Sequence, residues 1–169
     1  MVSVKIVLIS ATSLVGAVSA VPVQKEIDYL SILIPGEGLP TPQELGLTNK
    51  DLNKPMPRCM LPSNDNVLKK RSECRQNNTC SLSDSTGCFN DRLSLNETPC
   101  QVDGRPKQMC LVGSYSWIGN AEGVPSASSY CRDVAHGGNA VNNDSRFGDR
   151  VGGSKYAGGN GNLKVNIAG

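Results

Sequence analysis

The alternation of apolar and polar residues predicts a β-strand at the C-terminal end of the chain. Residues 162–167 read Asn-Leu-Lys-Val-Asn-Ile, in which every second side chain is apolar. A period of two is typical of a half-buried strand, because successive side chains of a strand point to opposite faces. The segments 107–112 and 115–118 are also predicted strands, separated by the turn pair Gly113-Ser114, and a further short strand is predicted over 92–95.

The best helix is predicted over residues 126–136, and residues 41–45 resemble a short capped helix. The apolar side chains of 126–136 recur at spacings of three and four, which gives one apolar stripe. Pro125-Ser126 suits its start and Gly137-Gly138 suits its end. Of the 26 residues in 137–162, 13 are Gly or Asn, which tolerate positive φ, so this stretch is predicted to form turns.

Residues 1–20 have the organisation of a cleavable signal peptide. A short segment with one positive charge precedes an apolar run of 15 residues, 6–20, which ends in Val18-Ser19-Ala20. A membrane-spanning helix needs about 20 apolar residues, so this run is too short to span a bilayer. We therefore expect a secreted, extracellular protein without membrane insertion.

Residues 21–71 are predicted to be a pro-segment. Their seven prolines are spaced so that no long helix or strand fits. The apolar stretch 29–34 suggests a short strand or an apolar segment that docks on the rest of the protein, the alternative being a disordered spacer. Lys70-Arg71 has the form of a site for kexin-type proteases, the alternative being an ordinary solvated charge cluster.

The cysteine count favours a cut after Arg71. The chain has seven cysteines, an odd number, and the cut would discard Cys59 and leave six. In a short secreted domain, six cysteines predict three disulfides, although six cysteines allow 15 pairings. A zinc site is not expected, since no C-x-x-C pair occurs and His136 is the one histidine. The domain 72–169 would hold Cys74, Cys80, Cys88, Cys100, Cys110 and Cys131.

Charge and residue types exclude several function classes. The chain has a net charge of +2, whereas residues 72–169 hold 9 basic and 9 acidic side chains. A neutral domain argues against nucleic acid as a partner, because such binders need a basic face. Nucleophilic catalysis would need His136, which is predicted to cap a helix C-terminus, so no enzyme and no cofactor is expected. Three sequons predict glycosylation at Asn77, Asn143 and, less favoured because of the proline that follows, Asn96.

Several short motifs resemble the killer protein 4 family of small secreted fungal and mycoviral toxins. The resemblance covers residues 72–167. It rests on Cys74-x5-Cys80, the segment from Asp103 to Cys110, His136-Gly137, the segment from Arg150 to Ser154 and the segment from Gly161 to Ile167, in that order. Family members carry cysteine where this chain has Gly138 and Gly152. If a shared bridge was lost there, the two glycines should lie near each other or beside a gap.

The resemblance implies both a fold and a function. The fold is a small two-layer α/β sandwich, an antiparallel sheet with helices on one face, stapled by disulfides. The function is inhibition of calcium channels on susceptible cells by a monomer, with Lys107 and the neighbouring Arg105 as target-binding residues between Cys100 and Cys110. Two alternatives remain: an apoplastic effector that uses the scaffold as an enzyme inhibitor or other binding protein, and a small secreted hydrolase.

Overall fold

A six-stranded antiparallel sheet forms the centre of the protein. The computed structural model describes residues 26–57, 72–158 and 161–169. The strand order is β1-β5-β6-β11-β10-β2, and β6 pairs with β11 from Leu163↔Ala121 to Ala168↔Ser116. The predicted strands at 107–112, 115–118 and 162–167 are confirmed as β5, β6 and β11. The strands are β1 (Leu33–Pro35), β2 (Glu73–Cys74), β5 (Lys107–Val112), β6 (Tyr115–Ala121), β10 (Gly153–Tyr156) and β11 (Leu163–Ala168).

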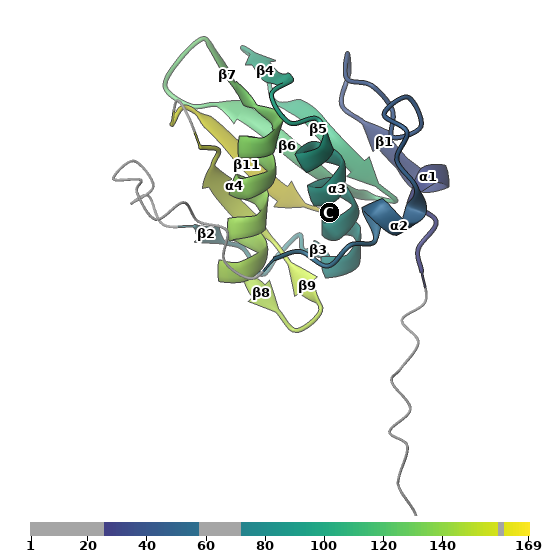
Figure 1. Ribbon diagram of the computed structural model, residues 1–169. Helices are drawn as coiled ribbons and strands as arrows, with labels where there is room; N and C mark the ends of the chain where they lie inside the picture. Colours follow the sequence, from purple (N-terminus) through teal and green to yellow (C-terminus); the bar gives the residue numbers. More distant parts are fainter. Residues whose placement is uncertain (1–25, 58–71, 159–160) are drawn as a thin grey trace, which may run out of the picture.

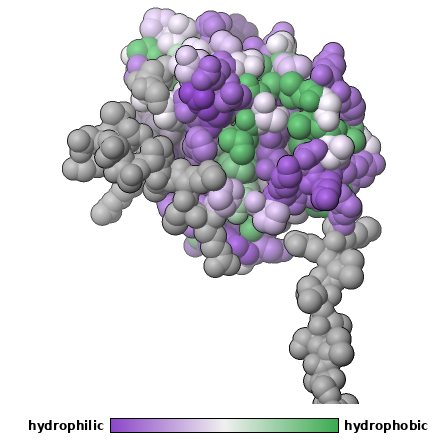
Figure 2. All heavy atoms as spheres, viewed as in Figure 1, coloured by the Kyte–Doolittle hydropathy of each residue, from purple (hydrophilic) through white to green (hydrophobic). Residues whose placement is uncertain are grey.

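Two long helices cover one face of this sheet. They are α3 (Leu82–Ser94) and α4 (Cys131–Asp144), which pack against each other (Figure 1). The predicted fold class, an antiparallel sheet with helices on one face, is therefore confirmed. On the face that carries these helices, hydrophilic residues are interspersed with smaller hydrophobic areas (Figure 2).

The helix α3 includes residues that were predicted to form a strand. The Ser81 side chain accepts a hydrogen bond from the Asp84 N–H and caps the helix start. Phe89 and Cys88 are buried on the helix face that meets the core. The strand predicted over 92–95 is wrong, because these residues form the last turn of α3 and the residue after it.

The helix α4 begins five residues later than predicted. Residues 126–130 form β7 (Ser126–Tyr130), which pairs with β4 (Pro99–Asp103) and shows the alternating burial of a strand. Tyr130 offers no side-chain cap. Instead, the N–H groups of Cys131 and Arg132 donate to the carbonyl oxygens of Thr98 and Asn96, at 2.9 and 3.0 Å. Carbonyl groups of a segment distant in sequence thus pair with the backbone N–H groups at the start of the helix.

Gly137 and Gly138 lie inside α4 and do not end it. A Cβ added at Gly138 would lie 2.1 Å from the Trp117 ring, and one at Gly137 would lie 3.2 Å from Ala157 Cα. These glycines let the sheet approach the helix closely. The prediction of turns over 137–162 is wrong for most of this stretch, because it also contains the strands β8 (Arg146–Phe147), β9 (Arg150–Val151) and β10.

The strands β8 and β9 belong to a small second sheet. The strand β3 (Cys80–Ser81) pairs with β9 and completes this sheet.

The segment 26–57 packs on the domain, so docking of the apolar stretch 29–34 is confirmed and the spacer alternative is wrong for this stretch, although only its end, from Leu33, is a strand. The segment contains α1 (Tyr29–Ile32), β1 and α2 (Asn49–Leu52). Tyr29 and Leu52 belong to the buried core. The signal peptide, Cys59 and Lys70-Arg71 lie outside the described residues. Within the described part of the chain, no helix is long and apolar enough to cross a membrane.

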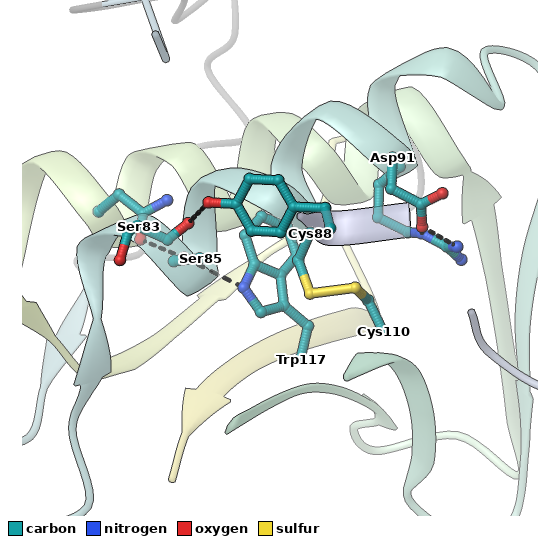
Figure 3. Close-up of a disulfide and its surroundings, with 9 residues drawn as sticks. Ser83, Ser85, Cys88, Asp91, Cys110 and Trp117 are labelled. Carbon is teal, nitrogen blue, oxygen red and sulfur yellow. Dashed lines mark hydrogen bonds and ion pairs between the residues drawn. A yellow bond between two sulfur atoms is a disulfide. The ribbon is translucent and has the colours of Figure 1, made fainter. Parts of the chain in front are cut away.

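Two disulfides link the helices to strands beneath them. Cys88 on α3 bonds Cys110 on β5, with 5.7 Å between the α-carbons, and Cys100 on β4 bonds Cys131 on α4, with 5.0 Å. Figure 3 shows the first bridge beside Trp117, the largest fully buried side chain. Disulfide stapling of the fold is therefore confirmed for four of the six predicted cysteines.

Candidate target-binding loop

Residues 104–106 form a tight connection between β4 and β5. Gly104 has φ +68°, a left-handed conformation that favours glycine. Its N–H donates to the Pro125 carbonyl at 2.8 Å, and the Arg105 N–H donates to the Asp103 carbonyl at 2.7 Å. These backbone hydrogen bonds hold Arg105 at the exposed tip of the connection, two residues before Lys107, which begins β5.

The loop is anchored on each side by a different disulfide. Before it, Cys100 is tied to Cys131 at the start of α4, and after it, Cys110 is tied to Cys88 in α3. The loop therefore has a separate bridge at each end, and no single bridge between Cys100 and Cys110 closes it. Fixing both strands to the helices restricts the loop before any partner binds, which lowers the entropy lost on binding.

Arg105 and Lys107 differ from the other basic side chains of residues 72–169. Seven of those 9 basic side chains have a carboxylate, carbonyl or hydroxyl partner: Arg75, Arg92, Arg132, Arg146, Arg150, Lys155 and Lys164. Among the described residues, the side chains of Arg105 and Lys107 make no ion pair or hydrogen bond. Arg105 is exposed and Lys107 is half-buried.

The lysines of residues 72–169 differ in whether they have an acidic partner. Residues 72–169 contain three lysines. Lys155 lies 3.1 Å from an Asp144 carboxylate oxygen, and Lys164 lies 3.0 Å from Glu73 and lowers the pKa of that carboxyl by donating a hydrogen bond to it. Lys107 is therefore the lysine of this domain whose charge is not neutralised by a described acidic neighbour.

Residues 69–169 match a protein family described as a domain of unknown function, DUF8794. The chain belongs to this family. No curated protein and no solved structure gives a significant match. The DUF8794 domain contains both long helices, both disulfides and the loop 104–106, whereas the segment 26–57 lies outside it.

The histidine of the DUF8794 domain does not cap a helix. His136 lies in the middle of α4, because the helix continues to Asp144. Burial lowers its pKa, and its Nδ1 has no hydrogen-bond partner among the described residues. The described part of the chain also holds no cluster of three His, Cys, Asp or Glu side chains placed to bind a metal ion.

The structure differs from the predicted disulfide set at Cys74 and Cys80, which carry thiols. Cys74 is exposed on β2, and its sulfur contacts the hydroxyl of Ser145. Cys80 is buried on β3, opposite Val151 in the small second sheet. The two cysteines belong to different sheets and face different neighbours. Burial, reinforced by the nearby Asp84 carboxylate, raises the pKa of the Cys80 thiol to about 12.

The three sequon asparagines, Asn77, Asn96 and Asn143, are all exposed in the structure. Asn77 lies in the connection before β3, and Asn96 follows α3 with φ +46°. Asn143 lies in the last turn of α4, where its amide donates to the Asn139 carbonyl at 2.9 Å. Exposure satisfies a requirement for glycosylation, and use of the sequons stays a prediction.

Neither glycine at a family cysteine position lies beside a gap. The space next to Gly138 is filled by Trp117, and a Cβ at Gly152 would lie 2.8 Å from the Arg75 carbonyl oxygen and 2.9 Å from a Thr79 methyl carbon. The close packing leaves no gap at either position, which removes one of the two expected signs of a lost bridge, and proximity of the two glycines stays a prediction. The chain instead uses both glycines for close approach.

Proposed function

We propose that this protein is a secreted, killer-toxin-like binding protein that acts on susceptible cells through Arg105 and Lys107. The observation that carries the proposal is the pair of basic side chains without acidic partners on a loop anchored by two disulfides. The antiparallel sheet with helices on one face agrees with the fold that the killer protein 4 resemblance implies. The proposed action is binding without catalysis.

A calcium channel is the proposed target because its pathway must be rich in carboxylates. A basic side chain that lacks an internal partner can interact with such a site without first breaking an ion pair. Since residues 72–169 have equal numbers of basic and acidic residues, the attraction comes from the loop and not from the overall charge. It should therefore be local and weakened by salt.

Substitution of the two basic residues tests the proposal. Secreted Lys107→Gln and Arg105→Gln variants are compared with the parent in growth inhibition and calcium uptake of sensitive cells. Loss of a hydrogen bond to a charged group costs about 1.5–3 kcal/mol, so potency should fall about 10-fold to 100-fold. Lys107→Arg keeps the charge and should retain most of the potency.

Arg146→Gln is the matched control. Arg146 is exposed like Arg105, but its side chain donates to the Gly148 carbonyl at 2.6 Å in the connection between β8 and β9. This variant should keep full potency. Equal potency of folded Lys107→Gln and parent would refute the role of the lysine. If the parent perturbs calcium entry in no cell tested, the channel function is refuted, and assays of host-enzyme inhibition and of polysaccharide, peptide and RNA hydrolysis then test the two alternatives.

A further inference from the structure

The N-terminal segment, defined as residues 26–57, completes the edge of the central sheet. Its strand β1 pairs antiparallel with β5, from Leu33↔Val112 to Pro35↔Cys110. Beyond β1, Gly36 passes so close to β5 that a Cβ there would lie 2.7 Å from the Gln108 carbonyl oxygen. Without this segment, β5 would be an edge strand with unpaired backbone groups.

A tyrosine anchors the N-terminal segment in a notch on α3. The notch exists because position 87 is glycine: a Cβ there would lie 2.5 Å from the Tyr29 ring. Tyr29 is 1% exposed, and its hydroxyl donates to the Ser83 carbonyl at 2.5 Å. Glycine is a poor residue for the middle of a helix, so its presence at this point is explained by the ring that it admits.

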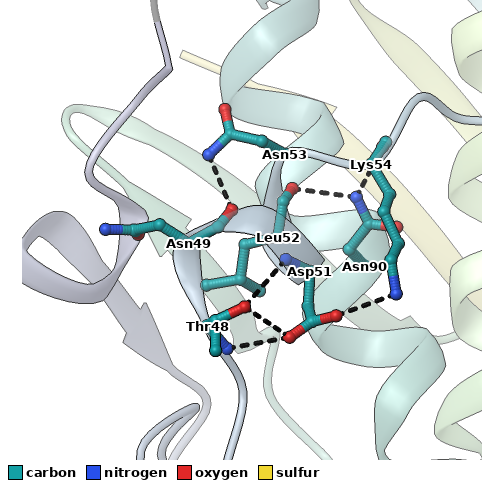
Figure 4. A network of polar contacts seen from close by, with 7 residues as sticks. All are labelled: Thr48, Asn49, Asp51, Leu52, Asn53, Lys54 and Asn90. Atoms are coloured by element: carbon teal, nitrogen blue, oxygen red, sulfur yellow. Dashed lines mark hydrogen bonds and ion pairs between the residues drawn. The ribbon is translucent and has the colours of Figure 1, made fainter.

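The other end of the N-terminal segment is held by α2 and the residues after it. Thr48 and Asp51 form a capping box at the start of α2, which places Leu52 in the core with no exposed surface. Asn90 of α3 donates from its amide to the carbonyl oxygens of Leu52 and Lys54, each at 2.8 Å (Figure 4). These contacts resemble those of an interface, with apolar anchors and hydrogen bonds at their rim.

We infer that the N-terminal segment is a separable subunit of this protein. It binds residues 72–169 as a strand and helix anchored by Tyr29, Leu33 and Leu52, and it stays bound after the chain is cut between Pro57 and Ser72. The inference goes beyond the proposed function and does not depend on it. The DUF8794 match, which begins at residue 69, shows that the segment lies outside the family domain that it completes.

A cut full-length chain tests the inference. A recognition site for a sequence-specific protease is inserted within residues 63–66, and the folded protein is cut there and kept at micromolar concentration. Native mass spectrometry and gel filtration should find one particle containing both pieces in equal amounts. Denaturing mass spectrometry should find two separate chains. Separation of the pieces under native conditions, whether residues 72–169 stay folded or aggregate, overturns the inference.

A pair of neighbouring residues supplies matched variants. Leu33 is 7% exposed, whereas Ile34, on the other side of the same strand, is 53% exposed. In the cut protein, Leu33→Ala should weaken retention of the segment about 30-fold, and Ile34→Ala should change it less than about 3-fold. Equal effects of the two substitutions would overturn the proposed anchoring.

A competition measurement covers the case in which Leu33→Ala prevents folding. A labelled synthetic peptide of residues 26–57 is added to the cut parent protein, and its exchange into the particle is measured against unlabelled peptides carrying either substitution. The Ile34→Ala peptide should compete like the parent peptide, and the Leu33→Ala peptide should need about 30-fold more. Failure of the labelled parent peptide to exchange in, while the original segment leaves, would contradict the inference.

Discussion

Replacing Gly138 by alanine should destabilise the protein although it adds a better helix former. Alanine is favoured over glycine inside a helix by about 1 kcal/mol. The new Cβ, however, would lie 2.1, 2.2 and 2.8 Å from three ring carbons of Trp117. Overpacking of this kind typically costs about 1–3 kcal/mol. Whether the substitution raises or lowers the free energy of unfolding therefore depends on how easily Trp117 can move.

Trp117 cannot move away from the added methyl group without a cost in free energy. The side chain is 1% exposed, and its Nε1 donates to the Ser85 hydroxyl at 3.1 Å. That hydroxyl donates in turn to Asn142 of α4 at 2.7 Å. Moving the ring would break this chain of hydrogen bonds, each contributing about 1 kcal/mol. We expect Gly138→Ala to lower the free energy of unfolding by about 2–3 kcal/mol.

Urea unfolding followed by circular dichroism measures this change. Gly158→Ala is the matched control, because a Cβ there would lie 3.7 Å from Asp133, an ordinary contact. This control should change stability by less than about 0.5 kcal/mol. Adding Trp117→Phe to Gly138→Ala should recover part of the loss, since the smaller ring leaves room for the methyl group. A Gly138→Ala protein as stable as the parent would refute the account.

Two further predictions follow from the surroundings of single groups. A small maleimide should modify Cys74 in the native protein but react with Cys80 only after unfolding, because Cys80 is buried and its thiol pKa is raised to about 12. Peptide mass spectrometry identifies the modified cysteines. Modification of Cys80 in the native protein would contradict the prediction. Burial raises the pKa of Tyr29 from 10.0 to about 12, so its contribution to stability should be complete below pH 10 and be lost as the pH rises toward 12. Urea midpoints across this range should fall more for the parent than for Tyr29→Phe, and equal falls would contradict the assignment.

Local patterns were sufficient for three strands of the central sheet, β5, β6 and β11. The alternation of 162–167 and the apolar run of 107–112 predicted β11 and β5, because a strand with one buried face must repeat every two residues. The helix α3 was missed although its start carried a signal. Ser81 followed three residues later by Asp84 is a helix-start pattern, and the apolar residues of 92–95 drew the interpretation toward a strand.

The residues that distinguish the candidate site needed the tertiary structure. Lys107 and Arg105 were selected from the sequence by resemblance alone. Among the described residues, Lys107 and Arg105 form no ion pair because Glu73, Asp144 and other carboxylates lie next to other basic side chains after folding. Sequence spacing contains no such information, since Glu73 and Lys164 are 91 residues apart and meet through the strands β2, β10 and β11.

The sequence by itself therefore determined three strands of the central sheet, β5, β6 and β11, the cysteine-rich character of the domain and the identity of its candidate cations. Only the tertiary structure decided how far α4 extends and where the N-terminal segment binds. For α4 the glycines were misleading, because local rules treat Gly137 and Gly138 as a helix end. Gly138 and Gly87 instead lie within helices because the rings of Trp117 and Tyr29 occupy the space where a side chain would be, a contact between residues distant in sequence.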